Sequence, residues 1–259
     1  MRSLEGMSIL VTGGGSGIGL GAARYCVERG ARVTICGRRE DKIQAAAAEF
    51  GDACCGVAAD ITVAADRQTL LEAAKNHGGQ LDALVNNAGN MYRGAITELD
   101  EAALQEVFHT NVIAAMMLTG LCTPYLEQQN GAVVFIGSIH TRRAFPGASP
   151  YAATKAAVQG LTRVLAAELG EKKIRVNCLL PGAVFTEINQ RAGLMDDETA
   201  LQRLEGMSDL HALGRIGTTE EIAEAIAYLM CAEWVTGAMI DIDGGLGLGI
   251  TPDPAIKKA

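Results

Sequence analysis

Proline is scarce in this sequence, and cysteine and histidine lack the spacings of disulfide or metal motifs. There are six prolines in 259 residues, and no segment rich in proline, serine or charge divides the chain, so one domain over residues 1–259 is expected. The seven cysteines form no CxxC pair, which favours reduced thiols in a cytoplasmic protein over a disulfide framework. The four histidines lie far apart, and no metal site is expected.

Positive charge and long apolar runs are lacking too. A net charge of −8 argues against nucleic acid as a partner. The longest apolar runs, such as 111–122, are too short and too punctuated to span a bilayer, so no membrane partner is expected. The first residues lack the apolar run and cleavage site of a signal peptide. The 49% hydrophobic residues and 31 glycines instead indicate a soluble α/β protein.

Strand-like apolar runs alternate with helical patterns along the chain. Continuous apolar strands separated by helices predict a parallel sheet covered on both faces, and right-handed crossovers make it doubly wound. The expected strands are 8–12, 32–36, 54–59, 81–86, 132–138, 174–180 and 238–243, and the expected helices are 17–29, 40–50, 64–77, 101–128, 151–169 and 219–230.

The segment 185–213 lies between two expected core strands but is long and helical in character. Its apolar side chains suit a helical hairpin packed on the core, or a lid over a substrate pocket, and both readings can hold. These side chains are Leu194, Met195, Leu201, Leu204, Met207 and Leu210.

A glycine-rich turn, TGGGSGIG at 12–19, follows the first expected strand and opens the first helix. Glycine permits close backbone approach, and a helix N-terminus favours negative charge, so a dinucleotide phosphate is expected here. No Lys-Ser/Thr follows the last glycine, which argues against a P-loop NTPase. The predicted cofactor contacts in the turn are Gly13, Gly15, Ser16, Gly17, Ile18 and Gly19.

The end of the second strand bears on the choice of cofactor. Gly37 stands where an acid for the adenine ribose is expected, and Arg38 and Arg39 follow at once. A guanidinium suits a 2′-phosphate, so NADP(H) is favoured. Glu40 and Asp41 come next, so NAD(H) is possible, and the two arginines also suit a solvated helix start.

Tyr151 and Lys155 lie four residues apart at the start of an expected helix. They therefore share a helix face, where the ammonium can favour the ionised phenol. Taken alone, this spacing equally fits a helix start with a solvated lysine.

Taken together, these motifs resemble the short-chain dehydrogenase/reductase family. The likeness runs from about Gly6 to Leu246 and rests on eight signatures in order: TGGGSGIG at 12–19, ADI at 59–61, NNAG at 86–89, Asn111, Ser138, YAATK at 151–155, PGAVFT at 181–186 and DGG at 243–245. The resemblance implies a Rossmann-like, doubly wound, seven-stranded parallel sheet. It also implies a homotetramer or homodimer formed through helices 101–128 and 151–170.

The resemblance assigns catalytic roles to four residues. Tyr151 is the general acid for ketone reduction and the base for alcohol oxidation, and Lys155 lowers its pKa and holds the nicotinamide ribose. Ser138 donates a hydrogen bond to the substrate oxygen, and Asn111 holds a water in a proton relay. Donors placed where a carbonyl gains negative charge are what hydride transfer requires.

Further cofactor contacts follow from the same resemblance, with Tyr151 and Lys155 counted among them. Asp60 and Ile61 correspond to an adenine-contacting pair. Asn87, Ala88 and Gly89 form a turn beside the adenine ribose, which is structural as well. The strand end that places the nicotinamide contributes Pro181, Gly182, Val184 and Thr186, whereas DGG is expected to be structural.

Pocket candidates are Met91, His140, Phe145, Pro150 and Met195. Methionine and aromatic side chains form adaptable apolar walls, so an apolar or cyclic ketone, such as a hydroxysteroid-like compound, is expected. His140 can bind a polar substrate group or be a surface histidine.

The expected function is therefore NADP(H)-dependent interconversion of a secondary alcohol and its ketone. The alternatives are a 3-oxoacyl thioester reductase of the same family and a non-catalytic dinucleotide sensor. The intact catalytic positions disfavour the sensor.

Overall fold

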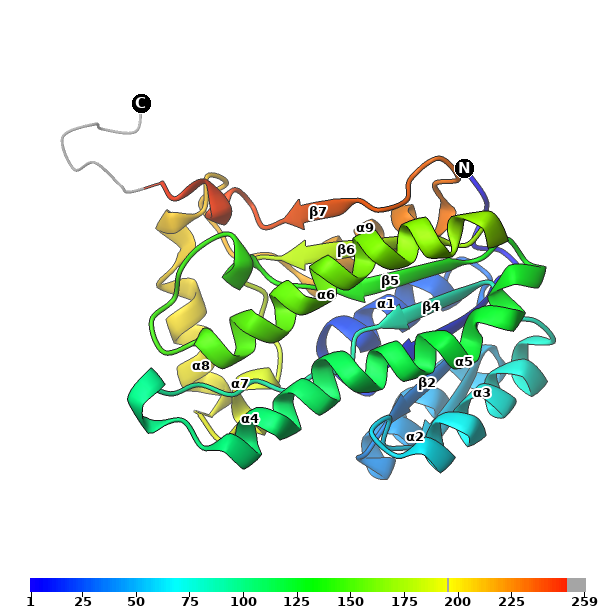
Figure 1. Ribbon diagram of the computed structural model, residues 1–259, viewed down its shortest axis with the longest axis horizontal. Coiled ribbons are helices and arrows are strands. Elements are labelled where there is room, and N and C mark those ends of the chain that lie inside the picture. Colours follow the sequence, from blue (N-terminus) through cyan, green and yellow to red (C-terminus); the bar gives the residue numbers. More distant parts are fainter. Residues whose placement is uncertain (195, 251–259) are drawn as a thin grey trace.

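The computed structural model of the protein describes residues 1–194 and 196–250, in which seven parallel strands form one sheet (Figure 1). The strand order is β3-β2-β1-β4-β5-β6-β7, the doubly wound topology expected from the sequence. The strands are β1 Ser8–Thr12, β2 Arg32–Gly37, β3 Cys54–Ala58, β4 Ala83–Asn86, β5 Ala132–Ile136, β6 Arg175–Pro181 and β7 Met239–Ile242.

Four strands, β3, β4, β5 and β7, are shorter than their apolar runs suggest. For β4 and β5, polar side chains explain why. β4 begins after Asp82, whose buried carboxylate accepts hydrogen bonds from Arg2 (2.7 Å) and from the amide of Ser8 (2.9 Å). β5 ends at Ile136, because Ser138 caps a 3₁₀ turn at Ile139–Thr141 instead of continuing the strand. This early end frees Ser138 for the site described below.

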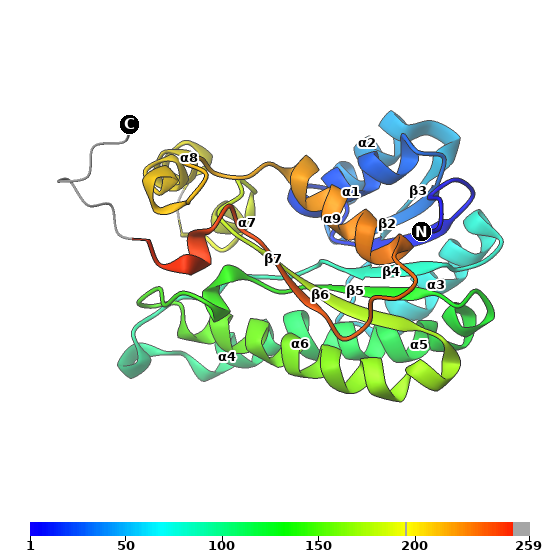
Figure 2. The same ribbon diagram turned by 90° about the horizontal axis from the view of Figure 1, so that it is seen from above.

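Helices cover both faces of the sheet (Figure 2). One face carries α1 (Gly17–Val27), α2 (Glu40–Phe50) and α9 (Thr219–Cys231). The other carries α3 (Ala64–Gly78), α4 (Glu101–Phe108), α5 (Ala114–Gln128) and α6 (Ser149–Glu168). Strands buried on both sides explain the continuous apolar runs in the sequence.

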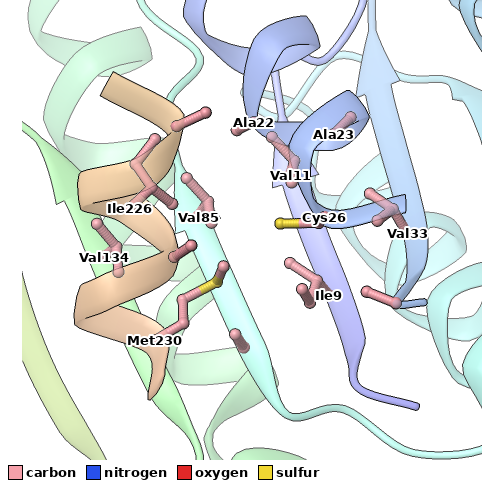
Figure 3. Close-up of a cluster of buried hydrophobic side chains, with 14 of the residues drawn as sticks. Ile9, Val11, Ala22, Ala23, Cys26, Val33, Val85, Val134, Ile226 and Met230 are labelled. Atoms are coloured by element: carbon pink, nitrogen blue, oxygen red, sulfur yellow. The ribbon is translucent and has the colours of Figure 1, made fainter. Parts of the chain in front are cut away.

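The core between α1, α9 and the sheet is built from small and branched side chains (Figure 3). Ile226 and Met230 of α9 lie in the same buried cluster as Ala22 and Cys26 of α1, on one face of the sheet. Gly21 lets the two helices approach closely, because a Cβ there would lie 2.9 Å from Thr219. Six of the seven thiols are buried and Cys55 is partly buried.

α9 is fixed at both ends by polar groups. Thr218 and Glu221 form a capping box at its start. The last turn contains no basic residue of its own, and the buried Arg175 of β6 takes that place. Its guanidinium donates to the carbonyls of Leu229 (2.7 Å), Met230 (2.6 Å) and Ala232 (2.9 Å), which the end of an α-helix otherwise leaves unpaired.

The helix expected over 101–128 is interrupted by a π turn, His109–Ile113, between α4 and α5. Within the described chain, this 28-residue run is the one helical segment long and apolar enough to cross a membrane by length and composition, contrary to the expectation that no run would be. Leu118, Cys122 and Leu126 on it are fully buried, as in a core helix.

The segment 185–213 is helical, as expected, and lies beyond the carboxyl ends of the strands (Figure 2). It contains α7 (Ile188–Arg191), α8 (Asp197–Glu205) and a 3₁₀ turn at Ser208–Leu210. Leu204, Met207 and Leu210 pack against a small buried cluster of Ile139, Ala183 and Leu246. Met195, predicted to contact substrate, lies outside the described residues.

Candidate active site

A cavity opens at the carboxyl ends of the central strands, beneath α7 and α8. In doubly wound proteins, ligands bind at the loops that follow the carboxyl ends of the strands. Many of the residues predicted from the sequence line it: Gly13, Ser16, Gly17, Ile18, Met91, Asn87, Ala88, Gly89, Ser138, His140, Phe145, Tyr151, Lys155, Pro181, Gly182, Val184 and Thr186. Those not on its wall are Gly15, Gly19, Arg38, Arg39, Asp60, Ile61, Asn111 and Pro150.

The glycine-rich turn packs too closely against neighbouring backbone to accommodate side chains at Gly13 and Gly19. Gly13 and Gly17 have φ of 67° and 55°, and a Cβ on Gly13 would lie 3.0 Å from Ala88. A Cβ on Gly19 would meet the carbonyl of Gly13 at 2.3 Å. Ser16 stands at the N-cap of α1, so the first turn directs its amides toward the cavity. This cradle fits a dinucleotide pyrophosphate.

The NNAG turn is tied to this cradle by hydrogen bonds. The Asn87 amide group donates to the carbonyls of Thr12 (2.8 Å) and Gly13 (3.2 Å). The Thr12 hydroxyl in return accepts from the backbone amides of Asn87 and Ala88, both at 3.0 Å. The turn is therefore structural, and Gly89 lets the chain pass the side chains of Asn111 and Lys155 closely.

The two arginines after β2 have different surroundings. Arg38 is exposed, whereas Arg39 donates to the Ser16 hydroxyl (3.1 Å) and pairs with Glu187 (2.6 Å). Burial acts to raise the pKa of Glu187, but the hydrogen bond and charge of Arg39 outweigh it and hold that pKa below its usual value. Arg39 thus links the glycine-rich turn to the segment 185–213.

Asp60 and Ile61 lie in the loop between β3 and α3, and neither is on the cavity wall. The Asp60 carboxylate accepts from the amide (2.9 Å) and hydroxyl (2.7 Å) of Thr62. The Ile61 carbonyl accepts from Arg67 at 2.6 Å. These bonds shape the loop before α3, and adenine contact by the pair stays a prediction.

Ser138 forms a compact group with aromatic and imidazole rings. Its hydroxyl lies 3.0 Å from Nδ1 of His140 and also accepts from the His140 amide at 3.3 Å. The His140 ring packs on Phe145 (centroids 4.5 Å apart) and edge-on against Tyr151 (5.2 Å). Burial, aided by the charges of Arg93, Lys155 and Arg203, lowers the pKa of His140 to about 4. The imidazole is therefore neutral at pH 7 and contacts Ser138.

Lys155 is buried at 5% exposure below Tyr151 on α6. Its ammonium donates to the Ile136 carbonyl (2.7 Å) and lies 5.5 Å from the centre of the Tyr151 ring. Burial lowers the pKa of Lys155 to about 8, opposed by Cys178. The spacing of four residues on one helix face thus brings the two groups together, as the sequence suggested.

Asn111 lies in the π turn, where the backbone departs from the α-helical pattern. Both of its amide protons are engaged, one by the Asn90 carbonyl (2.9 Å) and one by the Thr154 hydroxyl (3.0 Å). Its side-chain oxygen accepts from the Asn90 amide (2.8 Å). A relay water would therefore be held by a backbone carbonyl of the π turn or by the second lone pair of this oxygen.

Three charged residues on the cavity wall were not predicted: Arg93, Glu187 and Arg203. Glu187 directly follows the PGAVFT signature, so its place on the cavity wall could have been predicted from the sequence. Arg93 and Arg203 belong to no signature, and nothing in the sequence places them together. Among the described residues, no group of three His, Cys, Asp or Glu side chains is arranged to hold a metal ion.

Comparisons with known proteins agree with this geometry. The family described as short chain dehydrogenase matches residues 7–197. The chain belongs to the short-chain dehydrogenase/reductase family. It is 33% identical to dehydrogenase/reductase SDR family member 4 of Sus scrofa, over 94% of this chain and 88% of that protein. It is also 33% identical to a 3-oxoacyl-(acyl-carrier-protein) reductase of Chlamydia muridarum, over 94% and 98%.

Among solved structures, a 3-ketoacyl-(acyl-carrier-protein) reductase from Brucella melitensis complexed with NADH superposes with a TM-score of 0.87. The two chains are 32% identical, with 95% of this chain and 100% of that one covered. The protein is thus an NAD(P)-dependent short-chain dehydrogenase/reductase that acts on a CH–OH group. The cradle and the catalytic group face one cavity, as this chemistry requires.

Proposed function

We propose that this dehydrogenase uses NADP(H) to interconvert a secondary alcohol and its ketone, with Tyr151 as the general acid and base. The observation that carries the proposal is that Ser138, Tyr151 and Lys155 line the same cavity as the glycine-rich turn. A dinucleotide on that turn would extend along the cavity to the catalytic group. The bound nicotinamide supplies or accepts the hydride.

The chain's own residues handle the substrate oxygen and its proton. During ketone reduction the oxygen gains negative charge, which hydroxyl donors on Ser138 and Tyr151 stabilise. The Tyr151 phenol then gives up its proton, and the ammonium of Lys155 stabilises the resulting phenolate. The hydrogen bond from Lys155 to the Ile136 carbonyl holds its charge near the Tyr151 ring.

Ser138 can donate to substrate only if its own proton faces the cavity. His140 supports this orientation when its Nδ1 carries the proton and donates to the Ser138 oxygen. The backbone amide of His140 donates to the same oxygen. We therefore assign His140 as a positioning residue for Ser138, in place of the surface histidine that the sequence allowed.

The preference for NADP(H) rests on two residues at the end of β2. Arg38 is exposed there, and Gly37 stands where an NAD enzyme is expected to carry an acid. NAD(H) stays the alternative, because the Brucella relative was crystallised with NADH. Fluorescence titration with NADPH and NADH tests this choice. Tighter NADPH binding that Arg38→Asp reverses is expected, whereas equal affinities in the wild type would contradict it.

The cavity wall supports an apolar substrate body, since Met91, Ile139, Phe145, Leu204 and Met207 contribute to it. A cyclic or aryl ketone suits such a wall. The second candidate, a 3-oxoacyl thioester, is favoured by the names of the Chlamydia and Brucella relatives. A panel of cyclic ketones, aryl ketones and acetoacetyl-CoA, followed by NADPH absorbance, distinguishes the two. If the enzyme turns over none of these carbonyls, the proposed function is contradicted.

We also propose a homotetramer or homodimer formed through α5 and α6. Ile113, Met116 and Met117 near the start of α5, and Val164 of α6, are all about half exposed. Apolar side chains in such number on neighbouring helices suit a protein interface. Light scattering after size exclusion tests the assembly, and Met117→Glu should shift it toward the monomer.

A further inference from the structure

Two arginines from distant parts of the chain line the catalytic cavity together. Arg93 lies in the loop after β4, and Arg203 lies on α8 in the segment 185–213. Arg93 is partly buried, and one of its nitrogens donates a long hydrogen bond (3.4 Å) to the Pro146 carbonyl. Burial, and then the charge of Arg203, lower the pKa of Arg93, so each guanidinium lies within the field of the other.

The same two arginines lie near the catalytic group. Both of their charges reach His140 and help to lower its pKa, and His140 in turn contacts Ser138 and the Tyr151 ring. The pyrophosphate cradle of residues 12–19 is a different part of the wall. Arg93 and Arg203 thus line the same cavity as Ser138 and Tyr151, apart from that cradle.

This part of the cavity has an excess of positive charge. The ion pairs found among the described residues include neither Arg93 nor Arg203. Glu187 is the one acidic residue on the described cavity wall, and it is paired with Arg39. Arg93 is partly buried and Arg203 is exposed, and like charges on one cavity wall repel each other. An anion from outside the chain that contacts both guanidiniums would offset this repulsion.

We propose that the substrate is an oxo acid, or the corresponding hydroxy acid, whose anionic group binds between Arg93 and Arg203. The inference rests on the proposed function. The carbonyl lies against Ser138 and Tyr151, and an apolar spacer lies along Phe145 and Leu204. Guanidinium groups bind carboxylate, sulfonate or phosphate through paired hydrogen bonds. Because Arg203 belongs to α8 and Arg93 to the sheet's loops, the anion also ties the segment 185–213 to the body of the protein.

The test compares oxo acids with their neutral methyl esters. The probes are 3-oxocyclohexanecarboxylate, 6-oxoheptanoate and 4-oxo-4-phenylbutanoate, each with its methyl ester, and kcat/KM is measured with NADPH. Arg93→Gln and Arg203→Gln are compared with Arg32→Gln. This control removes one exposed charge at the amino-terminal end of β2, away from the cavity. We expect the ratio of acid to ester kcat/KM to fall by about tenfold to hundredfold in the first two variants and to be unchanged in Arg32→Gln.

Calorimetric binding of the same probes to the enzyme–NADPH complex separates this inference from the proposed function. Acids that bind more tightly than esters in an arginine-dependent way, but are not turned over, would support the anion site and contradict the reductase. Esters turned over as well as acids, with ratios unaffected by either variant, would contradict the anion site and leave the reductase. The enzyme could instead prefer acetoacetyl-CoA to acetoacetyl-N-acetylcysteamine and show no preference for the acids over their esters. That result would also contradict an oxo acid as substrate, since the anion bound by the arginines would then belong to the thioester carrier.

Discussion

Replacing Lys155 by methionine should change how the protein's stability depends on pH. Burial lowers the pKa of Lys155 from its ordinary 10.5 to about 8 in the folded protein. Between these values the unfolded chain holds the proton and the folded chain does not, so the folding contribution of Lys155 becomes more favourable as pH rises. One pKa unit corresponds to about 1.4 kcal/mol, so raising pH from about 7 to about 9.5 contributes roughly 2 kcal/mol.

The assay is urea unfolding of the wild type and of Lys155→Met at both pH values. Burial also raises the pKa of Cys26, Cys36 and Cys122 to about 12, which destabilises both proteins at alkaline pH and cancels in their difference. Wild-type stability minus variant stability should therefore rise by about 2 kcal/mol over this range. The exposed lysine variant Lys172→Met is the control. Parallel pH profiles for the wild type and Lys155→Met would refute the buried ammonium.

Three further predictions follow from side-chain contacts. His140→Ala should lower kcat/KM by roughly threefold to tenfold because Ser138 loses a positioning hydrogen bond. The pKa of His140 is about 4, so its titration should not affect kcat/KM near pH 6.5. A change of kcat/KM with pH near 6.5 that is absent from the variant would contradict this interpretation. Glu187→Gln frees Arg39 and should raise the ratio of NADPH to NADH affinity by about threefold, measured by fluorescence titration; an unchanged ratio would show that Arg39 does not reach the 2′-phosphate. Arg175→Met leaves three helix-end carbonyls unpaired and should lower the free energy of unfolding by about 3 kcal/mol and Tm by roughly 6–12 °C, with Arg175→Lys as the matched control; an unchanged Tm would refute the capping role.

The fold could be predicted because its sequence signals are local. Parallel strands buried on both faces are continuous apolar runs, and α2, for example, has the bounds that its pattern suggested. The π turn at His109–Ile113 was missed, since the extra residue it accommodates leaves the apolar pattern of 101–128 nearly unchanged. The ends of β4 and β5 were missed because they depend on bonds from Asp82 and Ser138 that form only after folding.

Most of the cavity residues that could be predicted belong to signatures, and Met91, His140 and Phe145 are exceptions that line the cavity as expected. Tyr151, Lys155 and Ser138 were found because each lies in a short motif, and the fold brings them to one cavity. The contact between His140 and Ser138 depends on the tight turn after β5, which the sequence does not reveal. Arg93 and Arg203 are 110 positions apart in the chain, and only the tertiary structure places their charges in one cavity.

The most direct test of the account is the turnover of Tyr151→Phe on a ketone that the wild type is shown to reduce. Phenylalanine keeps the ring that packs against His140 and removes the hydroxyl that is proposed to deliver the proton. We predict that kcat falls by roughly a hundredfold to ten-thousandfold. Turnover near the wild-type rate would contradict the assignment of Tyr151 as the general acid.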